Sequence, residues 1–141
     1  MAVITETHRC TNLLNFNVLH KTACDTVMGD FIVPKGTTTT CQLSLILEDE
    51  ADFVNPEQFS PDRYLENKKL AERVIPFSVG KRSCLGESLA RAEMFLISAN
   101  LIQNYKISVP EGQKPPRLGV ITTETMLKRS DPFEMKIEKV H

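Results

Sequence analysis

The sequence predicts an α+β fold that is mainly α with small β-sheets. A long helix is expected after Cys84, because apolar residues recur there at three- and four-residue steps: Leu85, Leu89, Ala92, Phe95, Leu96, Ala99 and Ile102. Short apolar segments separated by glycine turns predict hairpins nearer the N-terminus. Apolar and charged residues alternate over residues 133–138, which predicts a half-buried strand.

The elements expected before Cys84 are short. Residues 3–14 mix helix formers with apolar positions, which predicts the end of a helix. Residues 27–33 carry a Gly-Asp pair between two apolar runs, and this arrangement predicts a hairpin. A Pro-Lys-Gly turn over residues 34–36 precedes an extended segment, residues 37–43. Two prolines punctuate residues 55–64, which predicts irregular structure.

The elements expected after Cys84 are the long helix and further strands. The helix runs to about Gln103, and its apolar stripe predicts a buried face. Strands are predicted over residues 105–110, 118–122 and 133–138. The apolar faces of the first helix and of the short strands have few predicted partners, and such a sheet needs further layers to cover it. We therefore expect the chain to be one end of a larger fold.

Composition and charge exclude several classes of protein. The chain has 141 residues, 41% hydrophobic and 25% charged, which excludes a disordered or collagen-like protein. The net charge of -1 provides no basic field for nucleic acid. No apolar run approaches the roughly 20 residues that span a bilayer, and no signal peptide is evident, so the chain is expected to be cytosolic. The four cysteines form no CxxC pair and are expected to be free thiols.

Cys84 stands among residues that favour an ionised sulfur. A metal-binding thiolate must lose its proton, and nearby positive charge and a helix N-terminus both favour that loss. Lys81 and Arg82 supply the charge, and the helix expected to begin near Leu85 directs free N–H groups at the sulfur. A thiolate ligand also pushes electron density onto iron and favours O–O cleavage. Cys84 is therefore a candidate iron ligand.

The neighbours of Cys84 suit a flat ligand beside the sulfur. Gly80 and Gly86 let the backbone turn tightly and approach such a ligand closely. Phe77 can cover the sulfur against water, and Arg82 can reach an anionic group on the ligand's rim. The alternative is a buried structural cysteine in a glycine-containing turn. The complete pattern Phe-x-x-Gly-x-Arg-x-Cys-x-Gly, which opens an amphipathic helix, favours the ligand role.

This pattern resembles the haem-binding signature of the cytochrome P-450 family, the haem-thiolate monooxygenases. The resemblance implies that Cys84 is the axial ligand of the haem iron and the catalytic cysteine. It also implies that Phe77, Gly80, Arg82 and Gly86 contact the cofactor.

Two more stretches resemble the same family, in the expected order. Glu6 and Arg9 match its Glu-x-x-Arg pair, at i and i+3 on one helix face. Residues 56–64 resemble its Pro-x-Arg-Phe segment, with Tyr64 in place of the commoner phenylalanine. The resemblance implies a structural triad of Glu6, Arg9 and Arg63 that holds the proximal wall of the haem pocket. Alone, the first pair would be a solvated surface ion pair worth under about 1 kcal/mol.

The segment after this pair carries a further candidate haem contact. His20 lies where many animal microsomal members have a histidine that hydrogen-bonds a haem propionate. An ordinary surface histidine is the alternative. Asn15 stands where the family often has proline, which changes the expected shape of this loop.

The resemblance also implies substrate contacts. Leu13, Leu14 and Val18 belong to a loop that resembles a substrate-contacting segment of the family. Met126 and Leu127 resemble a second such segment near the C-terminus. Plain core packing is the alternative for all five side chains.

The activity that the resemblance implies is a monooxygenase with a thiolate-ligated haem b. Such an enzyme inserts one atom of O2 into an apolar organic substrate of xenobiotic, fatty acid or steroid type. Its electrons come from NADPH through a flavoprotein, NADPH-cytochrome reductase, and no nucleic acid takes part. The alternative is a truncated, catalytically inactive haem-binding or interaction fragment of the same family. The sequence does not identify the substrate, because specificity lies mostly in the distal half of these enzymes.

Residues 1–141 are expected to form the C-terminal part of a cytochrome P-450 domain. The expected order is the end of the Glu-x-x-Arg helix, hairpins, meander, haem-binding loop, long helix and last strands. This is well under half of a family member. No counterpart is found for the helix with the oxygen-activating acid–alcohol pair or for the N-terminal membrane anchor. A full-length relative would lie on the cytoplasmic face of the endoplasmic reticulum membrane, and we expect this chain alone not to catalyse the reaction.

A small zinc-binding domain is the unrelated alternative. Its ligands would be His8, Cys10, His20 and Cys24, whose spacings fit no common zinc pattern. The haem site is therefore the favoured interpretation.

Overall fold

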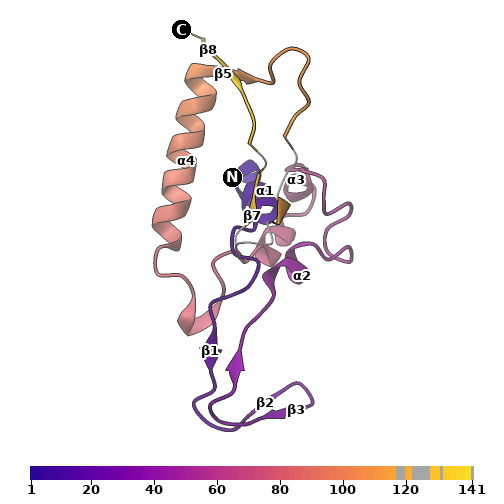
Figure 1. The fold of residues 1–141 in the computed structure, drawn as a ribbon, viewed down its shortest axis with the longest axis vertical. Helices are drawn as coiled ribbons and strands as arrows, with labels where there is room; N and C mark the ends of the chain where they lie inside the picture. Colours follow the sequence, from indigo (N-terminus) through magenta and orange to yellow (C-terminus); the bar gives the residue numbers. More distant parts are fainter. Residues whose placement is uncertain (117–119, 122–127, 131, 141) are drawn as a thin grey trace.

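The computed structural model describes residues 1–116, 120–121, 128–130 and 132–140. Its helices are α1 (Ala2–Thr11), α2 (Leu43–Leu47), α3 (Arg63–Glu66) and α4 (Glu87–Asn104), with 3-10 turns η1 (Lys68–Arg73) and η2 (Gly80–Arg82). Helix α4 runs along one side of the molecule, and α1, α2 and α3 cluster beside it (Figure 1). The predicted fold class, mainly α with small sheets, is confirmed.

The described strands form two-stranded antiparallel sheets. The pairs are β1 (His20–Lys21) with β4 (Thr38–Thr39), β2 (Thr26–Met28) with β3 (Phe31–Val33), β5 (Tyr105–Ser108) with β8 (Lys136–Lys139), and β6 (Val120–Ile121) with β7 (Lys128–Arg129). The first two sheets lie at one end of the molecule, and β5 with β8 lies at the other (Figure 1).

Helix α1 is shorter than the predicted range of residues 3–14. It ends at Thr11 because Asn12 adopts a left-handed backbone, with φ of 32°, and its N–H donates to the carbonyl of His8 at 3.0 Å. A left-handed residue of this kind is a common helix stop. The chain then leaves the helix axis, so residues 13–18 form a separate loop.

The segment over residues 26–47 confirms the predicted hairpin and corrects the segment after it. Met28 pairs with Phe31 around Gly29, whose φ of 59° suits the tight turn. The expected extension over residues 37–43 is only partly found, because Thr38–Thr39 is the strand and Leu43 already begins α2. The N–H of Leu43 donates to the carbonyl of Asn15 at 2.9 Å, so a contact with the earlier loop places the start of this helix.

The hydrophobic core lies between α2, α3 and the segments that connect them. Its buried members among the described residues are Leu43, Leu47, Phe53, Tyr64 and Val74. The apolar residues packed against them are Ala2, Leu70, Ala71 and Ile75. The core therefore lies beside the buried face of α1, which carries Glu6 and Arg9.

Helix α4 confirms the predicted long helix but not its predicted buried face. The helix begins at Glu87 and ends at Asn104, two residues after the expected start near Leu85. Its stripe is exposed, with Leu89 64% and Leu96 58% accessible. The reason is that the described part of the chain packs α4 chiefly against β5 and α1, and neither covers the stripe.

The C-terminal strands follow the predicted order with shorter bounds. Strand β5 pairs with β8 so that Ile107 lies opposite Ile137, and Phe133 and Met135 precede the strand. The prediction of a half-buried strand is wrong, because Ile137 is 51% exposed and no described layer packs on it. Within the described residues, no helix is both long enough and apolar enough to cross a membrane.

Candidate functional site

The loop that carries Cys84 closes on itself through its backbone. The N–H of Cys84 donates to the carbonyl of Phe77 at 2.9 Å, and the N–H of Ser83 donates to that of Gly80 at 3.1 Å. Gly80 has φ of 80°, a left-handed conformation that favours glycine. Ser78 has φ of 64°, an unusual value for a residue with a side chain. The loop thus holds Phe77 and Cys84 together at its base.

One cavity of about 610 Å³ lies between this loop and the segment that follows α1. The cavity is lined by three residues of the sequence pattern around the cysteine: Phe77, Arg82 and Cys84 itself. The other described residues that line it are Thr7, His8, Thr11, Leu13, Leu14, Phe16, Asn17, Val18, Leu43, Pro76, Ser78, Ala90 and Met94. Most of the wall is apolar, and it contains one thiol and one guanidinium group.

These residues suit a flat apolar ligand with an anionic rim. Cys84 is a free, exposed thiol that borders the cavity. In the described part of the chain Arg82 forms no ion pair, so its guanidinium is available to an anion. A Cβ at Gly86 would lie 4.0 Å from the sulfur of Cys84, an ordinary contact distance, and Gly86 is not among the described residues that line the cavity. The donor set and the size of the cavity therefore fit haem.

The position of Cys84 relative to α4 differs from the prediction. Gly86 is the N-cap of α4 and Glu87 is its first residue, so Cys84 lies three positions before the first helical residue. The first helical turn also carries the carboxylate of Glu87, whose negative charge offsets part of the positive charge at the N-terminus of the helix. The N–H of Cys84 itself is used within the loop, by the carbonyl of Phe77.

The loop residues expected to contact substrate border this cavity. Leu13, Leu14 and Val18 all line it, and all three are exposed, so none of them packs in the core. Met126 and Leu127 lie outside the described residues.

His20 lies apart from the cavity. It is half-buried in β1, where it pairs with Thr39, and it is not one of the residues that line the cavity. Its contact with a propionate stays a prediction. The described residues contain no cluster of three or more histidine, cysteine or acidic side chains that could hold a metal, so His8, Cys10, His20 and Cys24 are not grouped.

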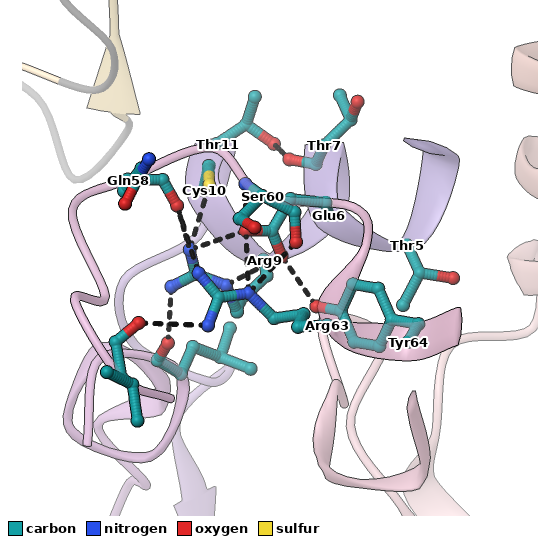
Figure 2. Close-up of polar contacts among 12 residues, drawn as sticks. Thr5, Glu6, Thr7, Arg9, Cys10, Thr11, Gln58, Ser60, Arg63 and Tyr64 are labelled. Carbon is teal, nitrogen blue, oxygen red and sulfur yellow. Dashed lines mark hydrogen bonds and ion pairs between the residues drawn. The ribbon is translucent and has the colours of Figure 1, made fainter. Parts of the chain in front are cut away.

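The structure brings Glu6, Arg9 and Arg63 into direct contact (Figure 2). Arg9 donates from Nε to Oε2 of Glu6 at 2.9 Å and from Nη2 to Oε1 at 3.0 Å. Arg63 donates from Nε to Oε1 at 3.1 Å. The side chains of Glu6 and Arg9 are fully buried, so the alternative of a solvated surface pair is wrong.

Both arginines also hold backbone carbonyls of the surrounding loops. Arg9 donates to the carbonyl of Leu47 at 3.0 Å, and its guanidinium lies 5.1 Å from the ring centroid of Phe53. Arg63 donates to the carbonyl of Val54 at 3.0 Å, and both arginines donate to that of Gln58. The triad therefore ties α1 to the segment over residues 47–63.

Tyr64 is a fourth member of this network, which the sequence did not indicate. Its hydroxyl donates to Oε2 of Glu6 at 2.6 Å (Figure 2). Burial would raise the pKa of Glu6, but hydrogen bonds from Arg9, Tyr64 and the backbone N–H of Ser60 outweigh it and lower the pKa to about 2. Burial and the bond to Glu6 raise the pKa of Tyr64. The departure from the family's phenylalanine thus adds a hydrogen bond.

A second unforeseen contact joins the loop after α1 to the cysteine loop. Nδ2 of Asn17 donates to Oγ of Ser78 at 2.8 Å, and both residues line the cavity. The two residues lie 61 positions apart, so no local pattern indicates their contact.

Comparison with known proteins gives one family. Residues 1–137 match a family model described as Cytochrome P450. The chain is 40% identical over 142 residues to dog "Cytochrome P450 2D15" and 40% identical over 119 residues to pig "Vitamin D(3) 25-hydroxylase". These matches cover 98% and 82% of this chain.

A solved structure agrees with this result. The zebrafish cytochrome P450 determined with abiraterone is similar over 99% of this chain, with a TM-score of 0.87 and 30% sequence identity. The match spans 32% of that structure, 28% of the dog relative and 24% of the pig relative, so this chain covers about a quarter to a third of each.

Proposed function

The chain belongs to the cytochrome P450 family, and from that premise we propose that Cys84 is the axial thiolate ligand of a haem b. One observation carries the proposal: Cys84, Phe77 and Arg82 border the same cavity of about 610 Å³ as the apolar loop after α1. The cavity offers sulfur for iron, an apolar wall for the ring and a cation for its acidic edge.

Each residue of the site has a separate role in this proposal. Cys84 would hold the iron, Arg82 would pair with a propionate, and Phe77 would exclude water from the sulfur. Gly86 leaves the space beside the sulfur free of a side chain. The network of Glu6 would hold the backbone beneath the site, because its arginines anchor carbonyls of the neighbouring segment.

For the whole protein we propose a monooxygenase that acts on an apolar organic substrate of xenobiotic, fatty acid or steroid type. The haem would supply the activation of O2, with electrons from NADPH delivered by a flavoprotein reductase. Leu13, Leu14 and Val18 would present an apolar surface to the substrate, since all three border the cavity. We place the protein at the endoplasmic reticulum membrane, as its resemblance to microsomal members implies.

Carbon monoxide spectroscopy tests the ligand. The 141-residue chain is expressed with haem, reduced and exposed to carbon monoxide, and we expect the Soret band that is typical of a thiolate ligand. Cys84→Ser should abolish this band. Cys24→Ser is the matched control, because Cys24 is also an exposed free cysteine but lies outside the cavity lining. A thiolate band that survives in Cys84→Ser would disprove the assignment.

A second function, haem binding without turnover, is favoured for the chain by itself. The exposed stripe of α4 and the small core leave the described residues with little buried apolar surface. Folded proteins are stable by only about 5–15 kcal/mol, so such a chain has little margin. We expect no product when the haem-loaded chain is supplied with reductase, NADPH and substrate. Measurable turnover under these conditions would refute this second function.

A further inference from the structure

Phe77 is contacted by side chains from two different helices. The ring of His8, on α1, meets the ring of Phe77 edge-on, with centroids 5.0 Å apart and planes at 73°. The guanidinium of Arg91, on α4, lies 5.3 Å from the centroid of the same ring. Edge-to-face pairs and cations near aromatic rings both attract electrostatically. The two contacts therefore restrain the ring of Phe77 between α1 and α4.

The restraint on Phe77 extends to Cys84 through the backbone. The carbonyl of Phe77 accepts the N–H of Cys84 at 2.9 Å, which closes the loop between them. His8, Phe77 and Cys84 all border the same cavity. A shift of Phe77 would therefore change the place of the cysteine at the cavity wall.

The surroundings of His8 favour a ring contact over a polar role. His8 is 9% exposed, and its buried Nε2 has no hydrogen-bond partner among the described residues. An unsatisfied buried group costs about 1–3 kcal/mol, so another contact must offset it. Burial lowers the pKa of His8, and the charge of Arg91 lowers it further, while Glu87 acts in the opposite direction. A neutral imidazole can lie near the guanidinium without repulsion.

Arg91 is held in place on its own helix. Its Nε lies 2.8 Å from Oε1 of Glu87, one turn earlier in α4. This pair is partly exposed, so its main consequence is to orient the guanidinium toward Phe77. The cation therefore reaches the ring from a fixed position at the start of α4.

We propose that His8 and Arg91 clamp Phe77 and thereby position Cys84 to bind the haem iron. Both are positioning residues, since they act on the cysteine through Phe77. That the clamp serves haem binding rests on the proposed function, but the contacts of His8 and Arg91 with Phe77 are present in the chain without haem.

Hydrogen exchange of the Cys84 amide, measured by NMR on the chain without haem, tests the clamp directly. His8→Ala removes the edge contact, so we expect the Cys84 amide to exchange about three- to tenfold faster, as the usual strength of an aromatic pair implies. Arg91→Met removes the cation and should change the exchange in the same direction. This second variant keeps the test decisive if His8→Ala does not fold.

Two controls separate the clamp from general destabilisation. His8→Phe keeps an aromatic edge against Phe77, so its Cys84 amide should exchange as in the unaltered chain. Ile4→Ala creates a buried cavity elsewhere on α1, since Ile4 is 6% exposed and does not border the site. In Ile4→Ala, the Cys84 amide should exchange faster only by the factor that the measured loss in the free energy of unfolding accounts for. Equal acceleration in Ile4→Ala or in His8→Phe, or none in both clamp variants, would overturn the proposal.

The haem-loaded chain provides an independent readout. Loosening the clamp should reduce the fraction of the reduced carbon monoxide complex that shows the thiolate band, in His8→Ala but not in His8→Phe. An unchanged thiolate fraction in His8→Ala, in a chain that does form the band, would refute the positioning role. If the unaltered chain shows no thiolate band, the proposed function fails, and the exchange experiment still decides the clamp.

Discussion

Glu6 is the residue whose partners tie α1 to the rest of the chain. Its carboxylate is fully buried and accepts hydrogen bonds from Arg9, Arg63, Tyr64 and the N–H of Ser60. A buried carboxylate loses several kcal/mol of hydration and is tolerated only when its oxygens are well paired. Here the partners come from α1 itself and from segments more than fifty positions away, so the pairing depends on the folded chain.

Tyr64→Phe tests the fourth member of this network. The variant leaves the ring in the core and removes the hydroxyl that donates to Glu6 at 2.6 Å. Hydrogen bonds to charged groups contribute about 1.5–3 kcal/mol, so we expect a loss of that size in the free energy of unfolding. Urea denaturation followed by circular dichroism measures it.

The matched control is Tyr105→Phe. Tyr105 is 37% exposed in β5, and its hydroxyl has no hydrogen-bond partner among the described residues. Its removal should change the unfolding free energy by less than about 0.5 kcal/mol, as is usual at exposed positions. Equal losses in the two variants would show that Tyr64 gains nothing from Glu6.

At the scale of elements, the loop after α1 and the cysteine loop are joined side by side across the cavity. The Asn17–Ser78 hydrogen bond links them, and Ser78 has the left-handed φ of 64°. The left-handed backbone conformation costs about 1–3 kcal/mol for a residue with a side chain, and it persists only when surrounding contacts hold it. The N–H of Ser78 also donates to the carbonyl of Ile75 at 3.0 Å. The two loops therefore support each other.

A double-mutant cycle with Asn17→Ala and Ser78→Ala measures this support. Nδ2 of Asn17 donates to Oγ of Ser78, while Oδ1 of Asn17 accepts the N–H of Val18 at 2.8 Å. The cycle cancels the loss of the Val18 contact, which Asn17→Ala makes in either background, so we expect a coupling energy of about 0.5–1.5 kcal/mol in the free energy of unfolding from the shared bond. Urea denaturation of the unaltered chain, both single variants and the double variant supplies the four values. Strictly additive losses would show that the bond does not link the loops.

At the scale of the whole molecule, apolar burial is small and one polar network is central. Among the described residues, the buried hydrophobic side chains other than Ile4 form one cluster beside α2, whereas the stripe of α4 and the strands β5 and β8 are exposed. Stability must therefore depend strongly on the contacts of Glu6, Arg9 and Arg63. This dependence makes the fold sensitive to acid.

Acid should unfold the chain through Glu6. Its pKa is about 2 in the folded chain against an ordinary value of 4.5. The unfolded chain therefore takes up the proton first, and the stabilisation is complete above about pH 4.5 and is lost as the pH falls toward 2. The loss is on the order of 3 kcal/mol. Urea midpoints measured between about pH 5 and about pH 2 follow it.

His8→Phe is the control for this acid transition. Burial and Arg91 lower the pKa of His8, so its neutral form stabilises the fold above about pH 6.5 and that contribution is lost as the pH falls below it. The variant removes this contribution and should keep the steep loss below pH 4.5. If the urea midpoint of His8→Phe did not fall as the pH drops from 4.5 toward 2, the role assigned to Glu6 would be contradicted.

Sequence patterns predicted the elements whose contacts are local. The spacing of apolar residues indicated α4, and the Gly-Asp pair indicated the hairpin of β2 and β3. The short helix α2 was not predicted, because the contact between Leu43 and Asn15 starts it and no five-residue pattern contains that contact. The exposure of α4 was also missed, because an apolar stripe indicates that a face can be buried but not what lies against it.

The sequence by itself determined the family signature around Cys84, the i, i+3 pairing of Glu6 with Arg9 and the course of the long helix, because each depends on residues within a few turns of one another. The contact of Arg63 with Glu6 was expected only from the resemblance. Tertiary structure alone decided that Tyr64 also binds Glu6 and that His8 packs on Phe77. Such contacts join residues that are 58 positions or more apart, and only the path of the folded chain brings them within bonding distance.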